Sequence, residues 1–197
     1  MKILKNVFIS ILILFFLTNS SWSKSASEFI NSLSIEASNI LSSKLSEDEK
    51  IIRLKEIGEQ SVDIKGVGLY TLGKYRKTLT DNQKKQYEKL FKDYFLKSFS
   101  GRLVGYTDAK IAVLSEEIKN EKYTIVYSKL IGTSDRPEVK IDWRVYTKDP
   151  QKPLIRDLVI EGLSLARTQK EEFNSIIANN DGSIEALFEN LNRFLEN

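Results

Sequence analysis

The sequence predicts a single α+β domain, because helical patterns occupy both ends of the chain and strand-like runs occupy its centre. Apolar residues recur at helical spacing before residue 104 and after residue 163, whereas β-rich runs fill the stretch between 110 and 161. The links between these runs are of hairpin length, which indicates an antiparallel meander of four strands. No repeats, linkers or low-complexity tracts divide the 197 residues, so one core is expected.

The first segment has the pattern of an export signal. Two lysines precede an apolar run over residues 7–17, and Ser21 and Ser23 supply the small residues that suit signal peptidase. We therefore expect cleavage after Ser23, with residues 1–23 as the signal peptide and residues 24–197 as the mature domain. An uncleaved membrane anchor is the alternative, but the apolar run is shorter than the roughly 20 residues that span a bilayer.

Composition excludes several kinds of chemistry. The chain has 0 His and 0 Cys, so histidine-assisted nucleophiles, zinc sites of imidazole or thiolate, disulfides and cysteine-linked lipid anchors are impossible. Removal of the signal would take away two of the 30 basic residues and none of the 27 acidic ones, which lowers the formal net charge from +3 to +1. Nucleic-acid binding therefore has little support.

Helices are predicted on the N-terminal side of the strands. Apolar spacing indicates a helix over Ser25–Leu45 and a shorter one over Glu47–Ile57. Thr80 and Gln83 form a capping-box pattern at the start of a long helix. The predicted buried face of this helix is unusually aromatic and consists of Tyr87, Leu90, Phe91, Tyr94, Phe95, Phe99 and Leu103.

Four strands and two further helices follow along the chain. The strands are expected over Lys110–Leu114, Tyr123–Ile131, Glu138–Lys148 and Pro153–Glu161. The third is the clearest, because every second residue from 139 to 145 is apolar and so lies on one face of the strand. A helix is then predicted from Ser164 to Ala178, and after a break Ser183 caps a last helix.

One stretch is similar to a phosphate-binding loop in its glycine spacing. Gly68, Gly73 and Lys74 have the spacing of such a loop. Tyr75, however, occupies the position where the loop has a serine or threonine whose hydroxyl binds magnesium. Nucleotide binding is therefore not expected. We attribute Gly66, Gly68 and Gly73 to close packing between helices.

Three polar residues near the end of the last predicted strand deserve a chemical test. Asp157 and Glu161 lie four residues apart in a strand, so their Cα atoms are about 13 Å apart, beyond typical glycosidase pairs. The local interpretation is that Asp157 points to solvent or pairs with Arg156 or Lys152, and that Ser164 caps the following helix across a tight corner. Two alternatives stay open: an exported enzyme that uses a carboxylate such as Glu161, and a module that binds a partner at an exposed strand edge.

Several of these blocks together resemble the MlaC family, also called toluene-tolerance auxiliary proteins. They are the signal-like N-terminus, Leu72–Tyr75, the aromatic helix Tyr87–Leu103, and Asp157–Leu165 with Phe173 after it. The resemblance extends from about Phe29 to Leu195. Two departures concern the pocket wall and rim: Arg76 stands where many relatives have Trp, and Gln169-Lys170 stands where many have Tyr-Arg.

The resemblance implies a periplasmic phospholipid carrier and not an enzyme. Its fold would be a twisted antiparallel four-stranded sheet wrapped by N- and C-terminal helices around an apolar lipid pocket. The implied partners are phospholipid and, transiently, an inner-membrane ABC transporter complex and an outer-membrane lipoprotein complex, in a system that maintains outer-membrane lipid asymmetry. It further implies a monomer with no catalytic residue, metal or cofactor and no stable membrane insertion.

The same resemblance turns residues of the predicted core into candidate pocket lining. By pattern alone, an aromatic helical stripe that faces an apolar strand is ordinary core. With the resemblance, the candidate lipid-binding residues are Leu72, Tyr75, Phe91, Phe95, Phe99, Leu103, Val139, Ile141, Trp143, Val145, Leu158, Ile160 and Leu163. The candidate rim or docking residues are the cations Lys74, Arg76, Arg167 and Lys170.

Overall fold

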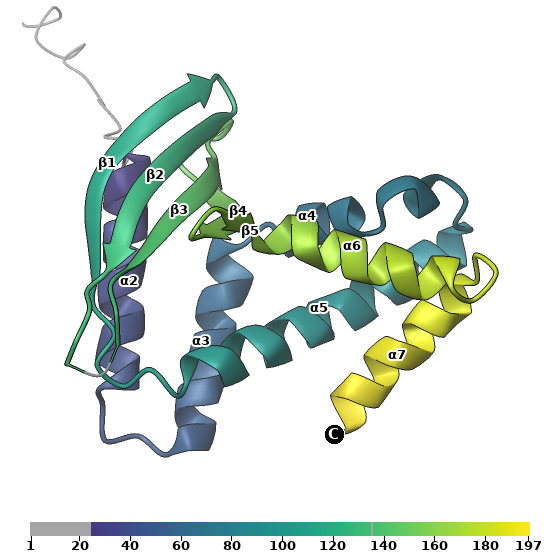
Figure 1. Cartoon of the computed structure of the whole chain (residues 1–197), viewed down its shortest axis with the longest axis horizontal. Coiled ribbons are helices and arrows are strands. Elements are labelled where there is room, and N and C mark those ends of the chain that lie inside the picture. The colour runs from purple at the N-terminus through teal and green to yellow at the C-terminus, as the bar shows by residue number, and fades with distance from the viewer. Residues whose placement is uncertain (1–24, 135) are drawn as a thin grey trace, which may run out of the picture.

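An antiparallel sheet forms one end of the molecule in the computed structural model, which describes residues 25–134 and 136–197 (Figure 1). The expected signal peptide lies outside the described residues. The strands follow one another in the sheet in chain order: β1 (Ile111–Asn120), β2 (Tyr123–Leu130), β3 (Val139–Tyr146), β4 (Leu154–Ile160) and β5 (Leu163–Ser164). The α+β class and the antiparallel meander are confirmed.

The sheet has one strand more than predicted. Glu161 and Gly162 have φ values of 48° and 84°, which places both in the left-handed region that a two-residue hairpin turn requires. The turn brings Leu163 into register with Ile160 and creates β5. What the sequence indicated as a strand-to-helix corner therefore contains a very short hairpin.

Two N-terminal helices begin with full capping boxes. In α2 (Ala26–Leu41), the Ser25 hydroxyl accepts a hydrogen bond from the Glu28 N–H, and the Glu28 carboxylate accepts one from the Ser25 N–H. The helix α3 (Glu47–Ser61) begins in the same way at Ser46. As Figure 1 shows, α2 lies behind the sheet and runs along it, whereas α3 lies between α2 and the other helices and ends at β4, where Val62 pairs with Ile155. The predicted helix to Leu45 ends four residues early.

The segment with the phosphate-loop spacing is helical. It forms α4 (Ile64–Thr71) and the 3₁₀ helix η2 (Gly73–Lys77), neither of which the sequence analysis predicted. A Cβ atom at Gly68 would lie 2.7 Å from Phe91 Cδ1 of the long helix α5 (Asp81–Leu103), so this glycine permits close helix packing, as expected. Thr80 and Gln83 form the predicted capping box at the start of α5.

The C-terminal helices pack on the same group of helices. They are α6 (Leu165–Ala178), whose N-cap Ser164 accepts a hydrogen bond from the Arg167 N–H, and α7 (Ile184–Glu196). Ser183 holds the N-cap position of α7, but its hydroxyl makes no capping bond to the helix backbone and donates to Glu185. No helix among the described residues is long and apolar enough to cross a membrane.

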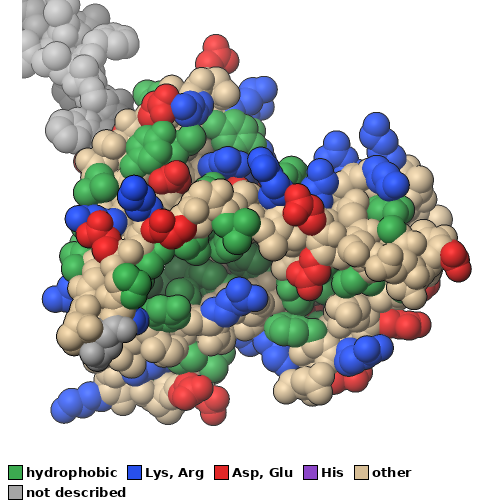
Figure 2. Space-filling view, viewed as in Figure 1, with side chains coloured by type: hydrophobic (Ala, Val, Ile, Leu, Met, Phe, Trp, Pro, Cys, Tyr) green, Lys and Arg blue, Asp and Glu red, His purple; other side chains and the backbone are tan. Residues whose placement is uncertain are grey.

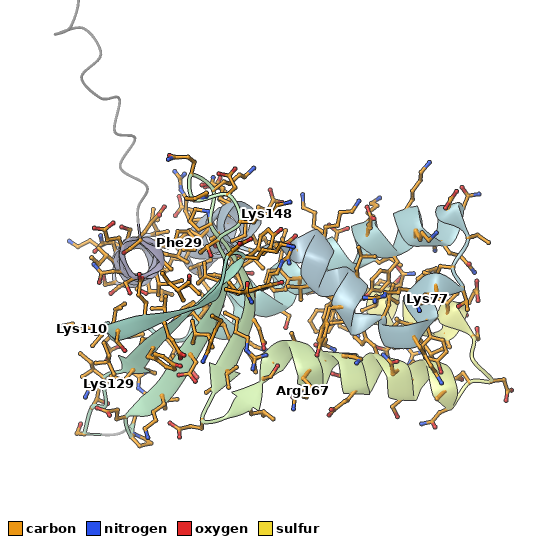
Figure 3. The ribbon with its side chains drawn as sticks, turned by 90° about the horizontal axis from the view of Figure 1, so that it is seen from above. Phe29, Lys77, Lys110, Lys129, Lys148 and Arg167 are labelled. Carbon is orange, nitrogen blue, oxygen red and sulfur yellow. The ribbon has the colours of Figure 1, made fainter. Side chains whose placement is uncertain are left out.

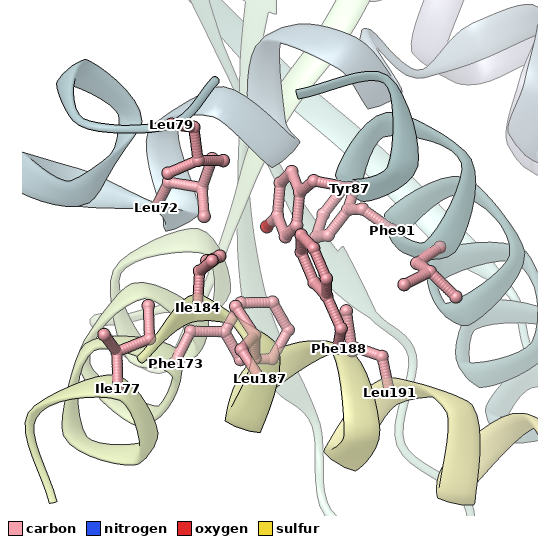
Figure 4. Close-up of a cluster of buried hydrophobic side chains, with 11 residues drawn as sticks. Leu72, Leu79, Tyr87, Phe91, Phe173, Ile177, Ile184, Leu187, Phe188 and Leu191 are labelled. Atoms are coloured by element: carbon pink, nitrogen blue, oxygen red, sulfur yellow. The ribbon is translucent and has the colours of Figure 1, made fainter. Parts of the chain in front are cut away.

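Two separate clusters of buried residues hold the fold together. One lies between α2 and the sheet and contains Ala26, Ile30, Val126, Ile141, Trp143, Val145 and Ile155. The other lies among α5, α6, α7 and the segment from Leu72 to Leu79 (Figure 4), and its buried members include Tyr87, Phe91, Phe173, Leu187 and Phe188. The molecule is thus a sheet lobe and a helical lobe, each with its own core.

Candidate functional site

An apolar hollow opens between the sheet and the helices. Figure 2 shows hydrophobic side chains gathered in a depression below the exposed strands of the sheet. On the sheet side, the apolar residues that pack around the α2 cluster without being fully buried are Ile111, Val113, Leu130, Val139 and Leu158. These side chains are apolar yet incompletely covered, so part of the apolar face that packs on α2 is open to the hollow.

Strand pairing shows that the predicted lining residues share that face. Val139 lies opposite Leu130, and Trp143 lies opposite Leu158 on the neighbouring strand. Ile160 lies opposite Ile141 and is half-buried. Cross-strand partners point to the same side of a sheet, so these residues form one continuous apolar surface.

The helix α5 presents an aromatic ladder to the space beyond its own core. Phe91 stacks on Phe95 at 6.3 Å between ring centroids, and Phe95 stacks on Phe99 at 5.7 Å. Phe91 is 2% exposed within the helical cluster, whereas Phe95, Phe99 and Leu103 are only half-buried. Phe91 and Leu103 are about 18 Å apart along the helix axis, so the stripe leads from the closed helical core toward the open part of the molecule.

Several predicted lining residues lie in closed cores. Leu72 and Val145 are 0% exposed, Leu72 in the helical cluster and Val145 in the α2 and sheet cluster. Tyr75 packs on the helical cluster and is partly buried. Leu163, by contrast, is mostly exposed to solvent: 59% of its surface is accessible on β5, where it pairs with Ile160. The structure therefore separates closed core positions from positions that border open space, and contact of either set with lipid stays a prediction.

Trp143 is held by a polar contact that the sequence analysis did not single out. Its Nε1–H donates to Ser128 Oγ at 2.8 Å, and the Ser128 hydroxyl donates to the Ile141 carbonyl at 3.0 Å. Both side chains are almost fully buried, so the indole is fixed in orientation. The signal for this contact was a serine at an inward-facing position of β2, between Val126 and Leu130.

Asp157 has a structural role that differs from the expected one. It is buried, and its carboxylate accepts hydrogen bonds from Ser164 Oγ at 2.6 Å and from the Ala166 N–H at 3.0 Å. Its ion-pair partner is Arg144, at 3.2 Å across the sheet. The interpretation that Asp157 points to solvent or pairs with Arg156 or Lys152 is therefore wrong. The carboxylate instead anchors the start of α6 to β4.

Arg156 forms a second connection between the lobes. Its Nε donates to Asp63 Oδ2 at 2.6 Å, Nη1 donates to the Tyr123 hydroxyl, and the guanidinium lies 3.6 Å from the centroid of the Tyr146 ring. Asp63 also caps α4 through the Gly66 N–H and donates its own N–H to the Ile155 carbonyl. The start of α4 is thus tied to the sheet by a backbone hydrogen bond and an ion pair, while the cation–π contact orients Arg156 within the sheet.

Glu161 has a structural role in the solvent-exposed turn between β4 and β5. It is exposed in the β4–β5 turn, where its carboxylate accepts the Lys140 N–H at 2.5 Å and its own N–H donates to the Lys140 carbonyl at 3.1 Å. These two bonds fix the turn against β3. Within residues 25–134 and 136–197, no group of three acidic side chains is placed to hold a metal ion.

The predicted rim cations lie along α6 and η2. Lys74 lies over the Tyr75 ring at 5.1 Å, and Lys170 lies over the Tyr70 ring at 5.3 Å. In Figure 3, Lys77 of η2 lies at the end of the molecule opposite Phe29 of α2, so η2 and its cations are remote from the sheet. Of the four, Arg167 in the first turn of α6 is next to β5.

The chain is similar to known proteins in both sequence and fold. The family model described as MlaC protein matches residues 32–193, which is most of the chain. A solved structure of a phospholipid-binding protein from Ralstonia solanacearum in complex with a phospholipid superposes with a TM-score of 0.73 at 18% sequence identity. The similarity covers 88% of this chain and 98% of that protein, and at this identity it shows a common fold.

Proposed function

The chain belongs to the MlaC family, and from this premise we propose that it is a periplasmic phospholipid carrier that encloses acyl chains in the hollow between the sheet and the helices. The observation that carries the proposal is the row of half-buried apolar side chains on both the sheet and α5. A structural relative that is a phospholipid-binding protein supports the choice of ligand. The exported location rests on the signal pattern of residues 1–23.

The energetics of such a ligand determine how it would be transferred. Two acyl chains contain on the order of 30 methylenes, each of which contributes about 0.8 kcal/mol when it leaves water, so gross burial approaches 25 kcal/mol. Chain ordering and incomplete packing reduce this sum, but spontaneous release into water would still be very slow. The carrier must therefore pass lipid directly to acceptor proteins. We place these acceptors in an inner-membrane ABC transporter complex and an outer-membrane lipoprotein complex, as the family implies.

Native lipid content tests the proposal most directly. The mature protein, isolated from a native envelope, would be extracted with organic solvent and the extract analysed by mass spectrometry. We expect phospholipid near one molecule per protein or somewhat below. A folded protein that carries none, from an envelope that contains ample phospholipid, would refute the carrier function and favour an enzyme or a protein-binding module.

Docking to the acceptor complexes makes a second, separable test. If the cations of η2 and α6 face the acceptors, the double variant Arg76→Glu and Lys170→Glu should slow lipid transfer and weaken its dependence on salt. Bound lipid should stay unchanged, because neither side chain borders the hollow. The matched control is a double reversal of Lys122 and Lys148, which are both exposed and lie at the same end of the sheet, where the Thr147 N–H donates to the Lys122 carbonyl. Equal transfer rates for all three proteins across ionic strength would place the docking surface elsewhere.

A further inference from the structure

A second concave site lies outside the hollow, in a groove that we define by α3, α5 and α7. It has a volume of about 870 Å³ and is open to solvent. Its apolar floor is made by Ile51, Leu96, Phe194 and Leu195. In Figure 1, α5 runs between α7 and the sheet. The groove is thus bounded by elements of the helical lobe and contains no residue of the sheet.

The groove and the hollow use different faces of α5. Asp93, Lys97 and Gly101 recur every four residues along the groove, whereas Phe95, Phe99 and Leu103 form the other stripe. Between the stripes, α3 closes on α5: a Cβ atom at Gly58 would lie 3.2 Å from both Leu96 Cδ2 and Phe99 Cδ1. This contact forms a wall, so a ligand in the groove would not compete for the space in front of the sheet.

Cations dominate the charge of the groove. Lys55, Lys97 and Arg102 line it together with a single carboxylate, Asp93. Among the described residues, none of these three cations has a carboxylate partner within ion-pair distance. Lys97 instead donates to the Leu195 carbonyl at 2.9 Å and lies 5.6 Å from the centroid of the Phe194 ring. The excess of positive charge beside apolar surface fits a ligand with an anionic head and an apolar tail.

Gly101 is a second observation that favours a ligand. It lies in the last turn of α5, two residues before the helix ends at Leu103, and glycine is a weaker helix former than alanine. Its backbone has no left-handed angle, and a Cβ atom there would meet no atom within 4 Å. Neither turn geometry nor packing within the chain therefore requires a glycine. A ligand that approaches the helix backbone closely would require one.

From these observations we propose that the groove of α3, α5 and α7 binds a single-chain anionic amphiphile, either a free fatty acid or a lysophospholipid. The acyl chain lies on Leu96, Phe194 and the bare backbone at Gly101, and Arg102 and Lys55 neutralise the carboxylate or phosphate. The volume falls within the roughly 300–1,000 Å³ of small-molecule sites. This inference is independent of the phospholipid carrier function, because it concerns other residues and another ligand class.

The test uses the lipid-loaded mature protein and defined amphiphiles below their micelle concentrations. Palmitate and palmitoyl-lysophosphatidylglycerol are the anionic probes, and hexadecyltrimethylammonium is the cationic control. Binding would be measured by calorimetry, with bound phospholipid quantified before and after. Gly101→Ala adds one methyl group where the acyl chain would lie on the backbone, and Gly101→Trp fills the same open space with a large ring. Arg102→Glu reverses one charge of the groove, and Lys85→Glu reverses an exposed charge of α5 outside it.

We expect the wild type and Lys85→Glu to bind at least one anionic probe while phospholipid stays bound, and Gly101→Ala to bind it more weakly than the wild type. Gly101→Trp and Arg102→Glu should each weaken this binding about tenfold or more, which corresponds to about 1.4 kcal/mol. Binding of palmitate alone would identify the fatty acid as the ligand class, and binding of both probes would identify the shared chemistry. Unchanged affinity in both variants, equal binding of the cationic control, or one-for-one displacement of phospholipid would overturn the proposal.

Discussion

A pair of phenylalanine substitutions on α5 separates lipid lining from ordinary core. Phe91 is 2% exposed, lies 5.7 Å from Tyr87 and 6.3 Å from Phe173 between ring centroids, and fits against Gly68. Phe91→Ala should therefore lower the free energy of unfolding by about 3–5 kcal/mol. Phe99 is two turns further along the helix and half-buried. Phe99→Ala should cost about 1–2 kcal/mol, because only part of its ring is removed from water.

Two assays convert this contrast into measurements. For a domain of this size, each kcal/mol shifts the melting temperature by about 2–4 °C, so delipidated Phe91→Ala should melt roughly 6–20 °C below the wild type. Phe99→Ala should lose about 2–8 °C on the same scale. Equilibrium partition of labelled phospholipid between protein and vesicles should change in the reverse order. A ring that contacts acyl chains contributes about 1.4 kcal/mol, so Phe99→Ala should shift partition roughly tenfold toward the vesicles.

The order of the two effects distinguishes lipid lining from ordinary core. If Phe99→Ala destabilises the delipidated protein as much as Phe91→Ala and leaves lipid partition unchanged, the half-buried end of the stripe is ordinary core. The hollow would then not be the lipid site. A result in which both variants lose lipid but only Phe91→Ala loses stability would keep the hollow and extend the site toward the helical lobe.

Three further expectations follow from single contacts. Gly68→Ala should lower the free energy of unfolding by about 1–3 kcal/mol in urea titrations, because its Cβ would lie 2.7 Å from a Phe91 ring carbon, and equal stability would contradict this packing. Glu161→Gln retains an acceptor for the Lys140 N–H and should leave lipid transfer nearly intact, whereas a loss of about two orders of magnitude in a folded variant would support a carboxylate-dependent enzyme. Burial raises the pKa of Tyr87 above its ordinary value, so the folded state keeps the phenol neutral while the unfolded chain ionises near pH 10, and stability should fall as pH rises above about 10. Melting curves of Tyr87→Phe should show a smaller alkaline loss, and an identical pH dependence would reject this linkage.

The sequence predicted best the features that depend on nearby residues. The capping box at Thr80 and Gln83 lies where the pattern indicated, because it needs only residues three apart. The alternation of β3 likewise identified the inner face of the sheet. The helix α4 was missed because Gly66 and Gly68 lower its intrinsic helix propensity, and the packing that stabilises it comes from Phe91 on another helix.

The site was predictable in its chemistry but not in its shape. Alternation in β3 marks Val139 and Trp143 as inward-facing, yet the same pattern results whether another element covers that face or leaves it open. Whether Phe99 borders open space depends on where α5 lies relative to the sheet, which is set by contacts distant in sequence. Asp157 shows the same limit, because its partner Arg144 is opposite it in the sheet and not adjacent in the chain.

The division into two cores explains how an apolar space can exist without undermining the fold. Folding requires buried apolar area, and here the α2 and sheet cluster and the helical cluster each bury their own. Polar contacts join the lobes at β4, where Arg156 binds Asp63 and Asp157 binds the first turn of α6. Because these joints are polar and local, they fix the distance between the lobes without filling the space between them. The apolar surface left there is then available to a ligand, and any ligand that binds the folded state alone adds to its stability.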